Sequence, residues 1–179
     1  PTTITGTLPT GITVPASTVS GVLSAATISG SSVVGNPMAR VYATTYTNIA
    51  VANTYYILQM SGTSYNNGMT VGPSGIQVPV AGYYQVNGAA NSNPATGGVY
   101  YAIKISVSNT PSATNPVSQT SIVFGETGSN ATYGMGLCVS DIVYATAGQW
   151  ISLYATSSTT GNISIGSQNT YLSASLVSQ

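Results

Sequence analysis

The sequence predicts an all-β protein, a two-sheet jelly-roll β-sandwich preceded by an extended N-terminal arm. Three observations lead to this fold class. From about residue 40 onward, short strand-like runs follow one another and are separated by turn residues. No stretch shows capped helical periodicity. The chain is also 42% hydrophobic, contains 13 Tyr and has no net charge, whereas disordered chains combine low hydrophobicity with high net charge.

Residues 1–36 differ from the rest of the chain and are predicted to form an arm. Tyr is absent there, and short apolar residues stand among Gly, Pro, Ser and Thr. Residues 4–8 align with residues 19–23, which suggests two copies of a repeat. A flexible linker is the alternative reading. Because one such strand cannot cover its own apolar side chains, neighbouring chains are expected to cover them at Leu8, Ile12, Val14, Val19, Leu23 and Ile28.

The body, residues 37–179, is predicted to contain eight to ten short strands. The first runs are residues 39–47 and 50–60, and Asn67-Gly68 within residues 64–71 is a hairpin-turn signal because both residues tolerate positive φ. A run at residues 76–87 follows. Residues 99–108 alternate apolar with small or polar side chains, which predicts a strand with one buried face. The remaining strands are predicted at residues 117–124, 137–144, 149–155, 162–165 and 171–177.

The chemical inventory excludes most classes of enzyme. Only four side chains are charged, namely Arg40, Lys104, Glu126 and Asp141, whereas an average domain is about 25% charged. There is no His and one Cys, so a catalytic dyad, a zinc site or a disulfide lacks its parts. Two basic residues give no hold on nucleic-acid phosphates, and no apolar run is long enough to cross a membrane. We therefore expect no catalysis, no cofactor, no metal, no nucleic-acid binding and no membrane insertion.

Each residue that could still take part in catalysis can also be explained by a structural role. Glu126 and Asp141 could form the carboxylate pair of a polysaccharide-degrading enzyme, but each is expected instead to pair with Arg40 or Lys104 or to accept backbone hydrogen bonds. A Ser–Lys nucleophile would have to use Lys104, which lies in mid-strand. Cys138 lies in a strand pattern and is expected to be a small, buried or half-buried hydrophobe.

Tyrosine is the remaining residue type that could provide a binding surface, since the chain has 13 Tyr against one Phe. Tyr combines a flat apolar ring with a polar tip, so it serves both sugar stacking and oligomer seams. Tyr84, Tyr101 and Tyr144 are expected in the core or at a seam. Tyr65 and Tyr133 lie in turn-rich segments and are predicted to be available for surface binding.

Three segments of the body follow one another in a characteristic order. Residues 75–86 contain an extended strand followed by Pro79, Gly82 and Tyr84, residues 143–153 form a hairpin pattern with Gly148 and Trp150, and residues 170–177 form a closing strand. These segments resemble, in order, the signature, a later hairpin and the final strand of the complement globular-head and tumour-necrosis-factor-like jelly-roll superfamily. The resemblance covers about residues 40–179. It implies a homotrimer whose subunits present a hydrophobic, often aromatic flank, but the charged or calcium-binding surface of complement-type heads is missing.

The arm resembles a second kind of protein. Residues 6–9 and 20–26 are similar to shaft segments of phage tail fibres. A shaft and a trimeric knob imply a structural fibre or spike at the virion surface, with the arm bound to other virion proteins and the jelly roll turned outward to attach to a host glycan or to decorate the particle. The alternative is an extracellular cell-surface filament subunit, assembled by insertion of the N-terminal strand into the next subunit's sheet.

Overall fold

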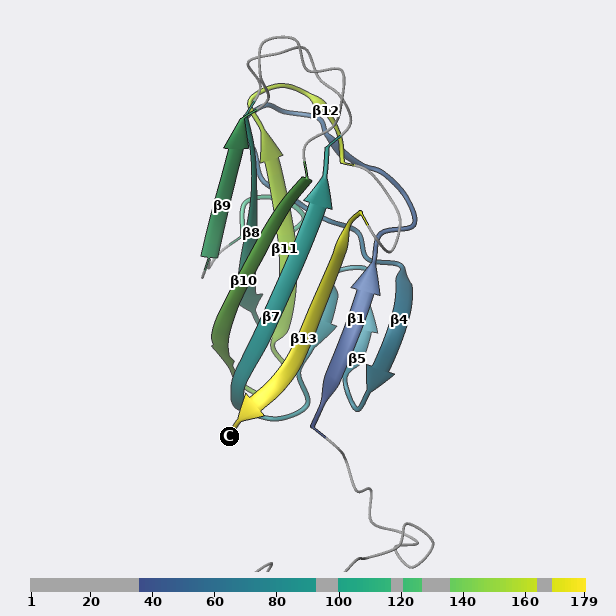
Figure 1. The fold of residues 1–179 in the computed structure, drawn as a ribbon, viewed down its shortest axis with the longest axis vertical. Coiled ribbons are helices and arrows are strands. Elements are labelled where there is room, and N and C mark those ends of the chain that lie inside the picture. The colour runs from purple at the N-terminus through teal and green to yellow at the C-terminus, as the bar shows by residue number, and fades with distance from the viewer. Residues whose placement is uncertain (1–35, 93–99, 117–120, 127–135, 164–168) are drawn as a thin grey trace, which may run out of the picture. The chain divides into compact units, whose positions relative to one another are not determined.

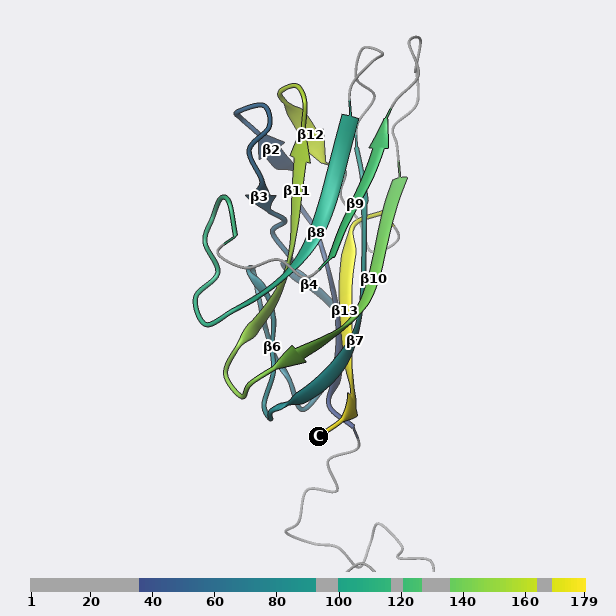
Figure 2. The same ribbon diagram turned by 90° about the vertical axis from the view of Figure 1, so that its left-hand side faces the viewer.

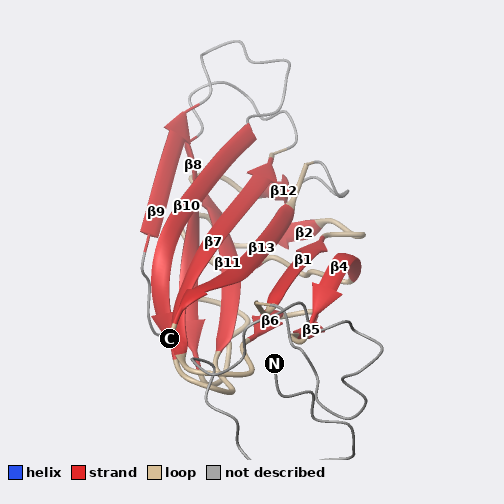
Figure 3. Cartoon of the chain, turned by 60° about the horizontal axis from the view of Figure 1, so that its bottom comes forward, coloured by secondary structure: helices blue, strands red, loops and turns tan. Residues whose placement is uncertain are grey.

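The computed structural model describes residues 36–92, 100–116, 121–126, 136–163 and 169–179. The predicted arm residues and Tyr133 lie outside these ranges, so the hypotheses made for them remain predictions. Every regular element in the described ranges is a strand, which confirms the all-β class (Figure 3). The strands are β1 (Met38–Tyr42), β2 (Thr47–Ile49), β3 (Tyr56–Ile57), β4 (Gly62–Asn67), β5 (Thr70–Gly72), β6 (Gly75–Gln77), β7 (Gly82–Asn91), β8 (Tyr100–Ser108), β9 (Ser121–Glu126), β10 (Gly136–Ala145), β11 (Trp150–Ser157), β12 (Gly161–Ile163) and β13 (Tyr171–Ser178).

The strands form two layered sheets. One has five strands in the order β10-β7-β13-β1-β4, and the other has the order β5-β6-β11-β8-β9 with β3 added beside β11. A short ladder joins β12 to β2. Figure 1 shows the five-stranded sheet in front of β8 and β11. Successive strands change sheets, for example from β7 to β8 and from β9 to β10, as in a jelly roll.

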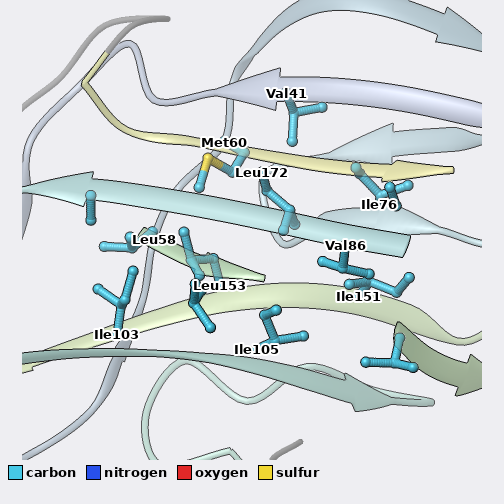
Figure 4. Close-up of a cluster of buried hydrophobic side chains, with 14 of the residues drawn as sticks. Val41, Leu58, Met60, Ile76, Val86, Ile103, Ile105, Ile151, Leu153 and Leu172 are labelled. Atoms are coloured by element: carbon cyan, nitrogen blue, oxygen red, sulfur yellow. The ribbon is translucent and has the colours of Figure 1, made fainter. Parts of the chain in front are cut away.

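The core lies between the two sheets and consists of aliphatic side chains. Figure 4 shows Val86 and Leu172, from β7 and β13, beside Ile103, Ile105 and Leu153 from the second sheet. All five side chains are buried. In β7 the alternation of buried and exposed residues places every second side chain in this core. Burial of each such side chain stabilises the fold by about 1.5–3 kcal/mol.

Three predicted strands are wrong in their extent. The run at residues 39–47 is interrupted, because β1 ends at Tyr42 and β2 begins at Thr47 in a different sheet. Residues 76–87 form not one strand but two, β6 and β7, which belong to different sheets. The chain bends at residues 79–81, where Pro79 has no N–H to donate to a ladder. Of residues 50–60, only the two residues of β3 are in a strand, because Asn53 takes a positive φ of 61° and the chain turns before Tyr55.

The prediction that β8 buries one face is also wrong. Ala102, Lys104 and Ser106 are as deeply buried as the apolar residues between them. Their face is covered by the residues before β3 and after β8, since the Tyr55 ring lies over the Lys104 ammonium and the Tyr154 hydroxyl donates to the Ser112 carbonyl. Period-two alternation therefore reports only which face meets the core, not whether the other face meets solvent.

The described body begins and ends at the same place. The Leu176 N–H donates to the Pro37 carbonyl at 2.9 Å, so the chain enters the body beside the strand on which it ends. A cavity of about 280 Å³ lies here, lined by Asn36, Pro37, Gly68, Pro79, Val80, Leu176 and Gln179. β12 lies at the opposite end in two perpendicular views (Figures 1 and 2), and β2 is paired with it.

Candidate functional site

The surface of the five-stranded sheet that points away from the core, here called the outward face, is the candidate functional site. Antiparallel register aligns its side chains in rows across the strands. One row joins Ile142, Gln85, Ser175 and Met38, and the next joins Ser140, Asn87, Ser173 and Arg40.

Large apolar side chains are concentrated on this sheet. Nine large hydrophobic residues in the described part of the chain are exposed, and six of them belong to strands of this one sheet, namely Met38, Tyr65, Tyr83, Ile142, Tyr144 and Val177. Ile142 and Tyr144 are each 54% exposed. Single exposed hydrophobics are ordinary on a monomer, so it is their concentration on one sheet, with Tyr83, Ile142 and Tyr144 grouped on β7 and β10, that marks a candidate interaction site.

Two tyrosines form the aromatic part of the outward face. Tyr83 in β7 and Tyr144 in β10 are register partners, and their ring centroids lie 5.2 Å apart at an interplanar angle of 63°. This edge-to-face geometry is favourable for aromatic pairs and fixes both rings. About half of each side chain remains exposed, so the pair presents a rigid apolar surface.

A polar network lies in the middle of the outward face. Gln85 Nε2 donates to Ser140 Oγ at 2.9 Å, and Ser140 Oγ donates to Asn87 Oδ1 at 2.8 Å. Ser173 Oγ donates to the Asn87 carbonyl at 3.4 Å. Because these hydrogen bonds cross from β10 through β7 to β13, they hold the polar side chains in one arrangement.

Aromatic rings also order the side of the sheet around β1. The Arg40 guanidinium lies 3.9 Å from the centroid of the Tyr171 ring. Tyr65 pairs with Arg40 across β4 and β1, and its side chain is 47% exposed. Tyr65 is therefore exposed, as its predicted role in binding requires, but it lies inside a strand rather than in a turn.

Cys138 contradicts its sequence interpretation, because it is exposed. Leu137 and Val139 on either side point into the core, so alternation directs the thiol outward, opposite Ala89. The exposed Met38, Tyr83, Ile142 and Val177 were not singled out from the sequence either. A signal was available for Ile142 and Tyr144, which stand two residues apart at positions that alternation assigns to the outer side of β10.

The residues of the superfamily motif lie where residues 75–86, residues 143–153 and the closing strand β13 come together. They are Pro79, Gly82, Tyr84, Gly148 and Trp150. Tyr84 is fully buried and donates its hydroxyl to the Val80 carbonyl at 2.8 Å. Gly82 has no room for a side chain, because a Cβ there would lie 2.5 Å from the Ser178 carbonyl oxygen of β13. The Gly148 N–H donates to the carbonyl of Val78, the residue before Pro79, at 2.8 Å, and Trp150 opens β11 two residues after Gly148. These residues build the fold rather than a binding surface.

A second polar cluster surrounds Lys104 on the covered face of β8. The Lys104 ammonium lies 3.4 Å from the centroid of the Tyr55 ring. Tyr154 is the register partner of Lys104, and its hydroxyl donates to the Ser112 carbonyl at 2.6 Å. Lys104 and Ser106 have the residue types of a Ser–Lys nucleophile, but their side chains are 6% and 1% exposed. A substrate could not reach either without removal of the cover, so the cluster is structural.

Burial perturbs the titration of this cluster. It lowers the pKa of Lys104 and raises the pKa of Tyr55, with a smaller increase from the neighbouring Tyr100. Burial also raises the pKa of Tyr154, which its hydrogen bond to the Ser112 carbonyl partly offsets. The neutral forms of the amine and of both phenols are therefore favoured in the folded protein.

Stability should rise with pH on the alkaline side of neutrality because of Lys104. Between its lowered pKa and its ordinary value of 10.5, the amine takes up a proton on unfolding, so increasing pH favours the folded state. At still higher pH the raised pKa values of Tyr55 and Tyr154 reverse the trend, since unfolded tyrosines ionise first. Urea midpoints measured from neutral pH to pH 10.5 should show the rise in the parent and not in Lys104→Met. Parallel profiles for the two proteins would contradict this account.

Among the described residues, no group of three or more His, Cys, Asp or Glu is placed to hold a metal ion. No helix within the same residues is long and apolar enough to cross a membrane.

Comparison with known proteins identifies the fold. No family model and no curated protein matches the sequence. Eiger TNF from S. frugiperda superposes with a TM-score of 0.60 at 9% identity, over 80% of this chain and 94% of that one. Murine APRIL at pH 5.0 gives a TM-score of 0.56 at 9% identity, over 80% of this chain and all of the other. The body of this chain therefore has the jelly-roll fold of tumour-necrosis-factor-like proteins, as its motif residues implied.

Proposed function

We propose that this protein is the subunit of a homotrimer and that the outward face is the interface between its subunits. The observation that carries the proposal is the gathering of six exposed large hydrophobic side chains on one sheet. Their removal from water is the main source of free energy for association. The polar network between them adds specificity, because a partner must match fixed donors and acceptors. The superfamily that the motifs resemble assembles as trimers with such a flank.

Within this proposal the trimer is a non-enzymatic fibre or spike at a virion surface. The likeness of residues 6–9 and 20–26 to fibre shafts supports the virion assignment. β1, the first strand of the body, begins at the end opposite β12 (Figure 1). The end with β12 would face the host or the medium, where a neutral surface suits the hydroxyl groups of a host glycan. The same arrangement would serve decoration of the particle, with the arm bound to other virion proteins.

Sedimentation of the full chain tests the trimer. At micromolar concentration we expect one species with three times the 18.1 kDa mass of the chain. A closed ring of three satisfies every interface, so no larger species should grow with concentration. A monomer at this concentration would refute the proposed assembly.

A secreted filament subunit is the second candidate function, and one observation favours it. β4 is the last strand of its sheet, all of its residues but Gly62 are exposed, and none is charged or Pro. Edge strands normally contain charged residues or Pro, which prevent the addition of another strand. An arm from a second copy could extend the sheet here and continue head to tail. Sedimentation separates the two functions, because a filament gives a series of sizes that increases with concentration.

A further inference from the structure

We propose that the end of the body at β12, here called the β12 end, contains a binding site for a neutral sugar. In this site the Tyr100 ring stacks on the sugar, and the Asn53 amide binds its hydroxyl groups. The inference rests on the proposed attachment function, because it requires that the β12 end face the host. It goes further by assigning the site to two residues and by selecting neutral over acidic glycans.

A second group of exposed apolar side chains, separate from the outward face, lies at the β12 end. The exposed large hydrophobic residues of the described part that are outside the five-stranded sheet are Tyr46, Val51 and Tyr100. Tyr46 and Val51 stand on either side of β2, the strand paired with β12. Tyr100 opens β8, and its N–H donates at 3.1 Å to Oγ of Ser158, which lies between β11 and β12. The Ser158 N–H donates back to the Tyr100 carbonyl at 3.0 Å.

The Tyr100 ring and the Asn53 amide are fixed relative to each other. The Tyr100 hydroxyl donates to Asn53 Oδ1. The Asn53 N–H donates to the Ser157 carbonyl at 2.7 Å, and its φ of 61° is a left-handed conformation that Asn tolerates. The Tyr100 side chain remains 37% exposed in this arrangement, and Asn53 is also exposed. Because both groups are in position before a ligand arrives, little conformational entropy is lost on binding.

The hydrogen bond between these two residues determines what they can offer a ligand. The Tyr100 hydroxyl donates its one hydrogen to Asn53, so its oxygen can only accept a further bond. Asn53 Oδ1 is the acceptor, and no described residue accepts a hydrogen bond from Asn53 Nδ2. A donor and an acceptor therefore lie together at the rim of an exposed aromatic ring. A pyranose matches this pattern, because it has an apolar face of C–H groups and a rim of hydroxyls that both donate and accept.

The distribution of charge favours a neutral sugar over an acidic one. The chain has two basic residues, Arg40 and Lys104. Arg40 lies against Tyr171 in the five-stranded sheet, and Lys104 is only 6% exposed. Glu126, one of the two acidic residues, is the register partner of Tyr100 across β8 and β9. An acidic sugar bound at Tyr100 would lose hydration without gaining a cation, whereas a neutral sugar has no charge to desolvate.

Saturation-transfer difference NMR on the full chain tests the site. The probes are the methyl glycosides of glucose, galactose, mannose, rhamnose and N-acetylglucosamine at millimolar concentration, with that of N-acetylneuraminic acid as the acidic comparison. We expect a signal from at least one neutral glycoside and a weaker one from the acidic glycoside. Tyr100→Ala should weaken binding about tenfold or more through loss of the ring. Asn53→Gly should weaken it about threefold, because Gly keeps the positive φ and removes only the amide.

Tyr46→Ala is the matched control, because Tyr46 is an exposed tyrosine that lies before β2, whereas Asn53 lies after it. Its signal should equal that of the parent. Circular dichroism checks that each variant is folded, and Tyr100→Leu, which keeps an apolar side chain without a ring, replaces Tyr100→Ala if that variant does not fold.

The outcomes distinguish failure of the sugar site from failure of the assembly, which sedimentation of the same samples reports. A trimeric parent that gives no signal with any neutral glycoside overturns the sugar site and leaves the trimer intact. A signal that survives the loss of the Tyr100 ring, or that falls equally in Tyr46→Ala, also overturns the assignment. A stronger signal from the acidic glycoside overturns the selection of neutral sugars. A monomeric parent overturns the proposed assembly, while the sugar site, which lies within one subunit, is still decided by the signals.

Discussion

The variant Ile142→Arg is expected to convert the trimer into monomers without unfolding the subunit. Ile142 is 54% exposed on the outward face, beside the Tyr83–Tyr144 pair, so the substitution leaves the core unchanged. At a subunit interface the new guanidinium would be desolvated, without a partner, in every subunit. A residue central to an interface commonly contributes 2 kcal/mol or more, so three copies should raise the dissociation constant by about four orders of magnitude.

Val51→Arg is the matched control for this experiment. Val51 is also β-branched, is exposed to a similar extent at 58%, and lies in a turn outside the five-stranded sheet. Sedimentation velocity at one fixed concentration should give a trimer for the control and a monomer for Ile142→Arg, with equal far-ultraviolet circular dichroism. If the control dissociates while Ile142→Arg remains a trimer, the subunit interface lies elsewhere.

A second large effect is expected from Gly75→Ala, this time on folding. Gly75 has a φ of +124°, and a Cβ there would lie 2.2 Å from the carbonyl oxygen of Ile151 in the central strand β11. Backbone conformations of this kind cost about 1–3 kcal/mol for residues other than Gly, and overpacking costs a similar amount. We expect a loss of about 3 kcal/mol, which lowers Tm by about 10 °C in a domain of this size.

Gly136→Ala is the control, because a Cβ at Gly136 would meet no atom within 4 Å. Its Tm should stay close to that of the parent, since exposed substitutions without a special conformation change stability by about 0.5 kcal/mol or less. Both variants are compared at the same protein concentration, because assembly raises apparent stability. Equal thermal midpoints for Gly75→Ala and the parent would show that β6 can move away from β11.

Much of the architecture could be predicted from local patterns. The predicted strands at residues 171–177 and 137–144 differ from β13 and β10 by at most one residue at either end, because a strand with one face in the core shows its alternation directly. The motif residues around Gly82 and Gly148 correctly indicated the jelly roll. The reason is steric, since Gly82 packs against the backbone of β13 in a way that few other residues allow.

The candidate site was less accessible to this reasoning. The sequence predicts Tyr65 at the surface, where it is exposed, but it shows Ile142 only as part of a strand, and the residue type of Cys138 predicts burial for a side chain that is exposed. For Cys138, alternation is a better guide than residue type. Its neighbours Leu137 and Val139 already required it to face outward.

The sequence by itself determined the all-β class, the scarcity of charge and the alternation that divides most strands into two faces, because these depend on residues close together in the chain. Only the tertiary structure decided that β6 and β7 belong to different sheets, that Lys104 is covered by Tyr55, and that Met38, Tyr83 and Ile142 lie on one surface. Each of these depends on pairing between strands distant in sequence. Alternation gives the side of a strand on which a residue lies, whereas register and sheet order determine which residues lie beside it.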